Sequence, residues 1–466
     1  MLFELNRTAP RQVWRESHQI VRLALPMLVA QLAQVATGFV DTVMSGHVGT
    51  GDLAAVSLGS SVFLTCYVTL LGLVTALNPI LAHLQGANQI QRIGETARQG
   101  LWFGLFVGVG GLILMLALRP LLARSIHLPP EVVDKALLFI TGAALAMPAA
   151  MLHRALHAIA SALNRPRAIM FMSLSALALN VPLNYILIHG LFGMPRMGGA
   201  GCGWATAAAF WFNCIGLFCY IALNRHFTAY GILQRFSRPR PHAMKEMLKL
   251  GVPIGLSFFV EISLFTFIAL LISGLGTVVV ACHQAVLNFS SMIYMVPQSI
   301  STALAVRVGH SAGAGDYRQA RLITGVGLML GLLSALAIMA LTFLLRTHII
   351  ALYTSDPRLI AMGATLLIFA ALYQLADSTQ TIASSALRGY KLTTVPMVIH
   401  ISSFWVIGLG LGMTLGLTRW LTPEPLGVYG FWGALVISLS VAAVLLIFYL
   451  SRQSRALLTL NRIEQE

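Results

Sequence analysis

The sequence predicts an all-α integral membrane protein, with twelve transmembrane helices in two pseudo-twofold-related six-helix bundles. Three observations lead to this fold class. Of the 466 residues, 57% are hydrophobic and only 10% are charged, unlike the composition of a soluble domain. Twelve apolar stretches are each long enough to cross a bilayer. The two halves of the chain also repeat each other.

The composition argues against a soluble globular protein. A mean hydropathy of +0.81 over this length means that one core cannot bury all the apolar residues, so much of the surface must face lipid. The net charge of +15 comes from few charges in short segments, which favours a role in membrane topology over nucleic-acid binding. All five cysteines lie in apolar stretches without a CxxC pair, so no redox site is expected.

The apolar stretches each cover about 20 residues or more, enough for roughly 30 Å of hydrocarbon. Those of the first half lie near 20–45, 53–82, 100–122, 136–158, 168–189 and 200–223. Those of the second half lie near 250–274, 278–306, 322–345, 359–381, 395–417 and 428–450. With a cytoplasmic N-terminus, 23 of the 30 Lys and Arg residues fall inside, Arg154 and Arg388 among them. The positive-inside rule therefore places both termini in the cytoplasm.

The two halves superpose at a spacing of 227 residues. Identical residues that coincide include Pro26 with Pro253, Gly49-Thr50 with Gly276-Thr277, and His83 with His310. Register holds for roughly eighty residues, and a weaker match later pairs 159–165 with 383–389. Because each copy has six spans, both begin on the same side of the membrane. This predicts a pseudo-twofold axis along the membrane normal and a cavity between the bundles.

The repeat divides the chain into a first bundle (1–223), a cytoplasmic interdomain linker (224–249) and a second bundle (250–466). The linker is the only long polar stretch between spans. Its Arg and Pro residues suit a solvated connector better than a lipid-binding site. A repeat that builds its own cavity needs no partner chain, so function as a monomer is expected.

Three acidic residues lie inside the predicted spans: Asp41 in the first bundle, and Glu261 and Asp377 in the second. An ionised carboxylate at mid-bilayer costs at least ~2.5–3.5 kcal/mol, so such residues normally face a cavity on a transport pathway. The alternative is that one of them reaches the interface or stays protonated between helices. Two nearby carboxyl groups can share a proton, or bind Na⁺ with hydroxyl, carbonyl or water oxygens. The sequence leaves both ions open.

Amide and aromatic side chains accompany these acids in the spans. Asn180 and Asn184 are four residues apart and share a helix face. Buried amides either join neighbouring helices or serve function. An aromatic ring beside a carboxylate can hold an organic cation, although rings in spans more often pack. The other residues of this kind are Gln284, Asn288, Phe265, Tyr294 and Tyr373.

The sequence shows no catalytic constellation. None of the four lysines completes a GxxxxGK phosphate loop, and no GxSxG stretch is present. His153 and His157 lack the adjoining glutamate of an HExxH zinc site. We therefore expect a secondary active transporter without a cofactor, rather than an enzyme.

The repeat and the lone acids occur together with the stretches LALPMLVAQLAQVATGFVDTVMSG, GGAGCGWATA, HQAVLNFSS and ALRGYK. In this combination the chain resembles the multidrug and toxic compound extrusion (MATE) family, NorM branch, over nearly its whole length. The resemblance implies a V-shaped pair of bundles in the bacterial inner membrane. By alternating access it would export organic cations, such as ethidium and fluoroquinolones, in exchange for Na⁺ or H⁺.

The resemblance also implies residue roles. Glu261, Asp377 and Tyr294 match the cation site of the second bundle, where Na⁺ or H⁺ would bind. The candidate substrate contacts are Phe265, Gln284, Asn288 and Asp41.

In the first bundle, the resemblance links Asp41, Asn180 and Asn184 in a proton-linked network. It matches Pro26 to the proline at which the first helix bends.

The runner-up function is a lipid-linked oligosaccharide flippase, because related carriers share this architecture. Such a carrier needs cationic side chains in its cavity, whereas the charged residues deep in the predicted spans are acidic. An intramembrane enzyme with paired aspartates would need a GxGD stretch, which surrounds neither Asp41 nor Asp377.

Overall fold

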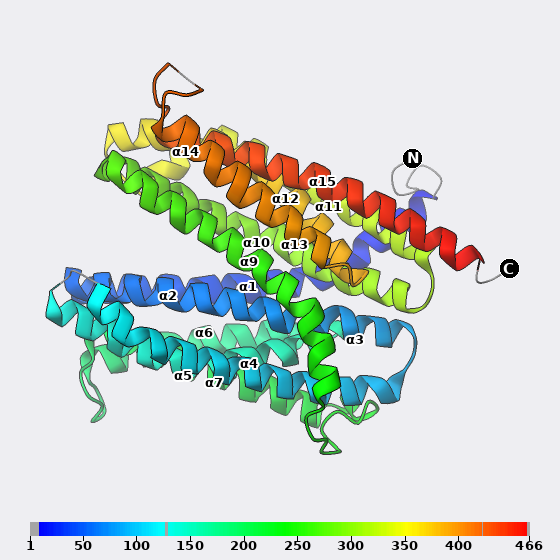
Figure 1. Cartoon of the computed structure of the whole chain (residues 1–466). Coiled ribbons are helices and arrows are strands. Elements are labelled where there is room, and N and C mark those ends of the chain that lie inside the picture. Colours follow the sequence, from blue (N-terminus) through cyan, green and yellow to red (C-terminus); the bar gives the residue numbers. More distant parts are fainter. Residues whose placement is uncertain (1–8, 126–128, 422, 464–466) are drawn as a thin grey trace. The chain divides into compact units, whose positions relative to one another are not determined.

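The structure is a computed structural model, and it describes residues 9–125, 129–421 and 423–463. Within these residues the chain is helical, without strands, and twelve helices are long and apolar enough to cross a membrane (Figure 1). Both the fold class and the number of spans predicted from the sequence are confirmed. The predicted cytoplasmic placement of the chain ends concerns residues 1–8 and 464–466, which lie outside the described residues.

The described residues of the first half form eight α-helices, of which α2 and α3 together form one span. They are α1 (Pro10–Val48), α2 (Thr50–Thr75), α3 (Leu77–Gly86), α4 (Ile90–Ser125), α5 (Pro130–Ala162), α6 (Pro166–His189), α7 (Gly201–Leu223) and α8 (Arg225–Thr228). The second half continues with α9 (Pro241–Ile272), α10 (Thr277–Gly313), α11 (Tyr317–Ala351), α12 (Pro357–Gly389), α13 (Thr394–His400), α14 (Gly410–Leu417) and α15 (Val428–Ile463). A π-helical segment, Ile401–Leu409, joins α13 to α14 in one span.

The chain forms two compact units. One is Pro26–Gly255, and the other joins Met1–Leu25 to Leu256–Glu466. Helix α9 begins at Pro241, inside the predicted linker 224–249, and the units divide α1 at Pro26 and α9 two residues after Pro253, rather than between the predicted bundles. A proline inside a helix lacks one backbone hydrogen bond, which eases the packing of the two helix ends against different neighbours.

Side-chain contacts account for this division. Glu16, in the first turns of α1, forms an ion pair with Arg307 of α10 and accepts a 2.9 Å hydrogen bond from Gln319 of α11. Met247, near the start of α9, lies in the apolar core built from α2 to α7. The N-terminal parts of α1 and α9 therefore each pack with the other half of the sequence.

The spacing of 227 residues persists in the structure far beyond the stretch visible in the sequence. Helices α5 and α12 begin at Pro130 and Pro357 and both contain 33 residues. After them, Asn164 and Lys391 adopt the left-handed conformation with φ of 59° and 61°. The weaker sequence match between 159–165 and 383–389 is therefore three residues out of the structural register. The backbone has kept the repeat where the side chains have diverged.

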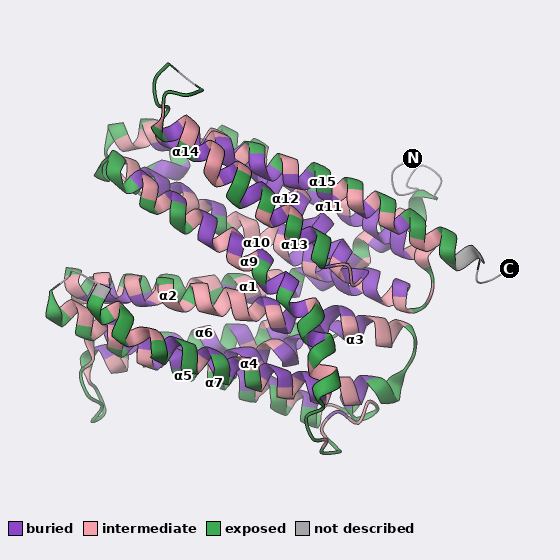
Figure 2. Ribbon diagram, viewed as in Figure 1, coloured by how far each residue is buried: buried purple, intermediate pink, exposed green. Residues whose placement is uncertain are grey.

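One long helix lies at the centre of each unit. Helix α5 packs against α2, α4 and α7, and α12 packs against α10, α11 and α15. Buried residues follow these two helices in Figure 2, while large apolar side chains such as Phe106, Phe171 and Leu344 are exposed. Small residues allow the close approach, since a Cβ at Gly108 would lie 2.6 Å from Cα of Pro148. The central helices also carry several of the charged side chains within the spans.

Candidate functional site

The second unit brings Glu261 of α9 and Asp377 of α12 together. Their carboxyl groups are close enough for their charges to interact. Asp377 is 1% exposed and Glu261 is partly exposed. Two negative charges repel each other strongly in such a low-dielectric environment. The pair is therefore suited to take up a proton or a cation.

A chain of hydrogen bonds holds Asp377 in place. Gln380 donates from Nε2 to Oδ1 of Asp377 at 2.9 Å, and Oε1 of Gln380 lies 3.0 Å from Nε2 of His400. Because this amide oxygen can only accept, Nε2 of His400 carries the proton. The second oxygen of Asp377, Oδ2, is buried and makes no hydrogen bond of normal geometry with the described residues. The hydroxyl of Tyr373 also interacts with this carboxyl group.

Hydroxyl and aromatic groups surround the two carboxyl groups. The hydroxyl of Tyr294 lies 3.4 Å from Oε1 of Gln298 and 3.5 Å from Oγ1 of Thr381. Tyr373 lies next to Asp377. The ring of Phe265 packs edge to face against the ring of Tyr373, with 6.2 Å between the ring centres. The structure thus places Tyr294 at the predicted cation site and packs Phe265 into an aromatic cluster beside it.

Arg388 also belongs to this region, although it was not predicted as a site residue. It was expected among the cytoplasmic charges, and it lies in the last turn of α12, which ends at Gly389. The guanidinium lies 5.6 Å from the centre of the Phe258 ring, and its charge acts on Glu261. Two carboxyl groups and one guanidinium therefore occupy this part of the second unit. The ALRGYK stretch contains Arg388 and was the available signal.

In the first unit, Asp41 lies in a buried hydrogen-bond network that was predicted in part. Asn184 donates from Nδ2 to Oδ1 of Asp41 at 2.6 Å, and to Oδ1 of Asn180 at 3.0 Å. Thr206 donates to Oδ2 of Asp41 at 2.8 Å. Asp41 is 5% exposed, and both asparagines are fully buried. Among the described residues no cation pairs with Asp41, so neutral donors alone satisfy it.

Thr206 was not predicted as part of this network. It lies on α7, within the stretch GGAGCGWATA that contributed to the family resemblance. Its hydroxyl cannot be distinguished by sequence from the many Ser and Thr hydroxyls that bond to their own helix. Pro26 lies inside the continuous helix α1, where the two compact units meet along the chain. A bend at Pro26 remains a prediction.

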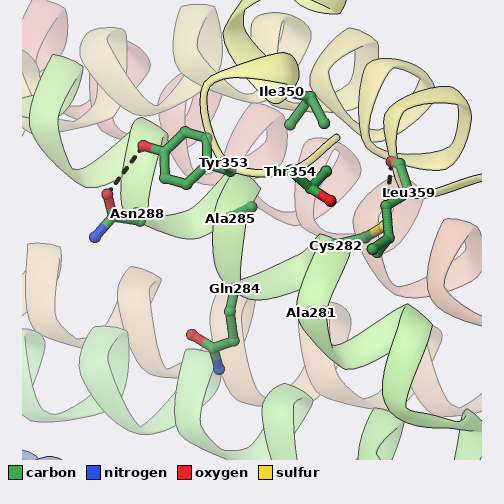
Figure 3. A pocket seen from close by; sticks show the side chains of 9 residues that line it. All are labelled: Ala281, Cys282, Gln284, Ala285, Asn288, Ile350, Tyr353, Thr354 and Leu359. Carbon is green, nitrogen blue, oxygen red and sulfur yellow. Dashed lines mark hydrogen bonds between the residues drawn. The ribbon is translucent and has the colours of Figure 1, made fainter. Parts of the chain in front are cut away.

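Two predicted substrate contacts line a pocket of about 390 Å³ in the second unit (Figure 3). Its walls come from α10, from the end of α11 with the loop after it, and from the start of α12. The lining residues are Ala281, Cys282, Gln284, Ala285, Asn288, Ile350, Tyr353, Thr354 and Leu359. Tyr353 donates to Oδ1 of Asn288 at 3.0 Å. A pocket of this volume suits a small molecule. The other two candidates, Asp41 and Phe265, are not among its lining residues.

Twelve apolar helices in a direct repeat, with carboxyl groups held inside the spans, define a polytopic membrane transporter rather than an enzyme. The sequence pattern of the MatE family matches residues 26–186 and 253–414. The chain belongs to this family, the multidrug and toxic compound extrusion transporters, and to its NorM branch.

Relatives support this assignment over almost the whole chain. A "Probable multidrug resistance protein NorM" of Chromobacterium violaceum is 66% identical over 455 residues, which is 98% of each chain. A protein of the same name from Neisseria meningitidis serogroup A is 48% identical over 98% of each chain. The "MATE transporter NorM-NG", whose structure was solved in a complex with a monobody, is 45% identical, with a TM-score of 0.80 over 94% of each chain. The family and fold predicted from the sequence are confirmed.

Proposed function

We propose that this protein is a secondary active antiporter of the bacterial inner membrane. It exports organic cationic, amphiphilic drugs and dyes in exchange for Na⁺ or H⁺ by alternating access. The observation that carries the proposal is the pair of carboxyl groups of Glu261 and Asp377, whose charges interact and of which Asp377 is 1% exposed. The names of the relatives, which refer to multidrug resistance, support the substrate class.

Coupling follows from the electrostatics of this pair. A drug cation is attracted while Glu261 and Asp377 are ionised, and that attraction weakens when a proton or Na⁺ neutralises one of them. Because each ligand changes the affinity for the other, the ion gradient can drive drug release. The described residues contain no cluster of three or more His, Cys, Asp or Glu that could hold a metal ion. Na⁺ would thus need further neutral oxygens, such as the Thr381 hydroxyl or water.

Asp41 supplies a second, proton-linked element in the first unit. As an ionised carboxylate it accepts from both Asn184 and Thr206. A protonated carboxyl group must itself donate one hydrogen bond. Oδ1 of Asn184 is buried and has no partner among the described residues, so rotation of this amide would provide the acceptor. Proton binding would therefore rearrange the contacts of α1 with α6 and α7.

The pocket of Figure 3 would receive an uncharged part of the substrate. No ionisable carboxylate, lysine or arginine lines it, while Gln284, Asn288 and Tyr353 provide polar contacts. This arrangement matches the mixed lining of small-molecule sites.

Ethidium efflux from proteoliposomes of the purified protein tests the proposal, with a Na⁺ gradient or a pH gradient imposed separately. Efflux with Na⁺ alone would identify Glu261 and Asp377 as a Na⁺ site. Efflux with the pH gradient alone would identify proton exchange. Movement with neither gradient would refute the antiporter proposal and reopen the alternative function, an oligosaccharide flippase.

A further inference from the structure

The first unit contains a counterpart of the carboxylate site with altered charge. At the spacing of 227 residues, which the backbone keeps, the residues of the two units correspond one to one. The corresponding pairs are Gln34 with Glu261, Tyr67 with Tyr294, Ala150 with Asp377, and Arg154 with Thr381. An amide and a methyl group thus replace the two acids, and an arginine replaces a neutral threonine. The counterpart site carries one positive charge and no negative charge.

Two hydrogen-bonded pairs, Gln34 with Tyr67 and Arg154 with Thr75, make up this region, and the charge of Arg154 acts on Tyr67. Gln34 donates from Nε2 to the hydroxyl oxygen of Tyr67 at 2.8 Å. Tyr67 and Arg154 are close enough to interact electrostatically, and their counterparts Tyr294 and Thr381 have their hydroxyl oxygens 3.5 Å apart. Arg154 also directs Nε and Nη2 to Oγ1 of Thr75, at 3.3 and 3.2 Å. The four residues Gln34, Tyr67, Thr75 and Arg154 form the donor cluster.

The donor cluster has more donors than acceptors. The oxygen of Tyr67 accepts from Gln34, which leaves the phenolic proton for another acceptor. Arg154 uses two of its N–H groups on one hydroxyl, and its Nη1 makes no hydrogen bond with the described residues. Gln34 is exposed, and both Tyr67 and Arg154 are partly exposed. These donors are therefore within reach of a ligand.

Among the described residues, Arg154 has no carboxylate as a counter-charge. Tyr67 is the only acidic group whose charge acts on it, and the ionisable groups His153 and His157 beside it are bases. A charged side chain within a span is unfavourable without a partner, and it normally marks a functional site. Arg154 lies within the predicted span 136–158, near the end expected to be cytoplasmic, and in the structure it lies inside α5, eight residues before the helix ends.

We propose that the donor cluster binds the carboxylate of a zwitterionic amphiphilic substrate. The inference rests on the proposed export function and deepens it, because it names the side chains that would bind the carboxylate of those substrates, such as fluoroquinolones, that carry one beside their cationic group. A guanidinium matches a carboxylate with two parallel hydrogen bonds, and the Tyr67 hydroxyl adds a third donor. A dye such as ethidium has no carboxylate and gains nothing from this cluster.

Binding of three fluorescent ligands to the purified full-length protein tests the assignment at pH 7.4. The ligands are a zwitterionic fluoroquinolone, its methyl ester, which lacks the carboxylate, and ethidium. Arg154→Gln should weaken binding of the zwitterion about tenfold, as expected for the loss of one charge-assisted pair. It should change the affinities for the ester and for ethidium less than about twofold. Arg154→Lys should keep part of the preference for the zwitterion over its ester. Arg165→Gln, at an exposed arginine, should keep this preference in full.

If Arg154→Gln lowers the affinities for the acid and the ester equally, or lowers neither, the assignment is overturned and Arg154 is a structural charge. If Arg154→Gln does not fold, Tyr67→Phe serves instead, because it removes one hydroxyl and keeps the ring. This variant should weaken binding of the acid, and not of the ester, by about threefold. Failure of the export proposal would look different, since wild-type liposomes would then move no ethidium under either gradient.

Discussion

Asn184 and Asp41, separated by 143 residues in sequence, form a buried hydrogen bond of 2.6 Å from Nδ2 to Oδ1. It joins α6 to α1 and holds a carboxylate within the first unit without any cationic partner among the described residues. A neutral donor stabilises the charged form without cancelling its charge, so Asp41 keeps the capacity to take up a proton. The first prediction follows from this bond.

Asn184→Ala should reduce efflux driven by a pH gradient by about tenfold. The change leaves Oδ1 of Asp41 buried without its amide donor, which costs about 1–3 kcal/mol. Ethidium efflux from proteoliposomes measures the effect. Asn213→Ala is the matched control, because Asn213 is a buried asparagine of the same unit that does not bond to Asp41. Equal losses in both variants would argue against the network.

Glu261→Gln and Asp377→Asn should each abolish gradient-driven efflux while the protein still folds. Each change removes one of the two charges whose repulsion makes the site take up a cation. Efflux is compared with that of Glu131→Gln, an exposed carboxylate at the start of α5. Full activity in both site variants would refute the assignment of the coupling site.

Gln380→Leu should change the ion dependence of efflux rather than abolish it. Gln380 is the amide that donates to Asp377 and contacts His400. Without it the ionised carboxylate loses a donor worth about 1–3 kcal/mol, so Asp377 should retain a proton more readily. The pH profile of efflux should shift to higher pH. An unchanged profile would show that Gln380 contributes to packing but does not influence the protonation of Asp377. Gln91→Leu, at an exposed glutamine near the start of α4, is the comparison variant.

Ala285→Trp should block the pocket of Figure 3 and lower the affinity for ethidium at least about tenfold. An indole in a pocket of about 390 Å³ removes much of the space for a ligand. Equilibrium binding to the purified protein measures this loss. Ala361→Trp, at an exposed position on α12, is the control. Unaltered affinity in the pocket variant would place the substrate elsewhere.

Gly203→Ala should lower the thermal stability, because a Cβ there would lie 2.4 Å from the carbonyl oxygen of Phe139 on α5. Overpacking of this kind typically costs about 1–3 kcal/mol. Gly110→Ala is the matched control, since a Cβ at that position would have no neighbour within 4 Å and alanine favours the helix. The apparent Tm of both variants, from tryptophan fluorescence, should fall only for Gly203→Ala.

Much of the fold could be predicted from the sequence, because the constraints of a membrane act on composition. Each span must be apolar over about 20 residues, and the copies of the repeat keep their spacing. The carboxylates Asp41, Glu261 and Asp377 were recognisable for the same reason, since charge is rare in apolar segments. The partners Thr206, Gln380 and His400 were not predicted, because their polarity is common and only distance singles them out.

By itself, then, the sequence determined the twelve helices, the direct repeat and the acidic residues whose chemistry suits a transport site. Only the tertiary structure decided which residues meet. It assigned the start of α1 to the unit of the second half, through Glu16 and Arg307, and placed Arg154 beside Tyr67 with no carboxylate partner among the described residues. Hydropathy is a local property of a segment, so it can be read along the chain. Contacts between helices depend on how side chains from distant segments interdigitate, and that is settled only when the helices pack.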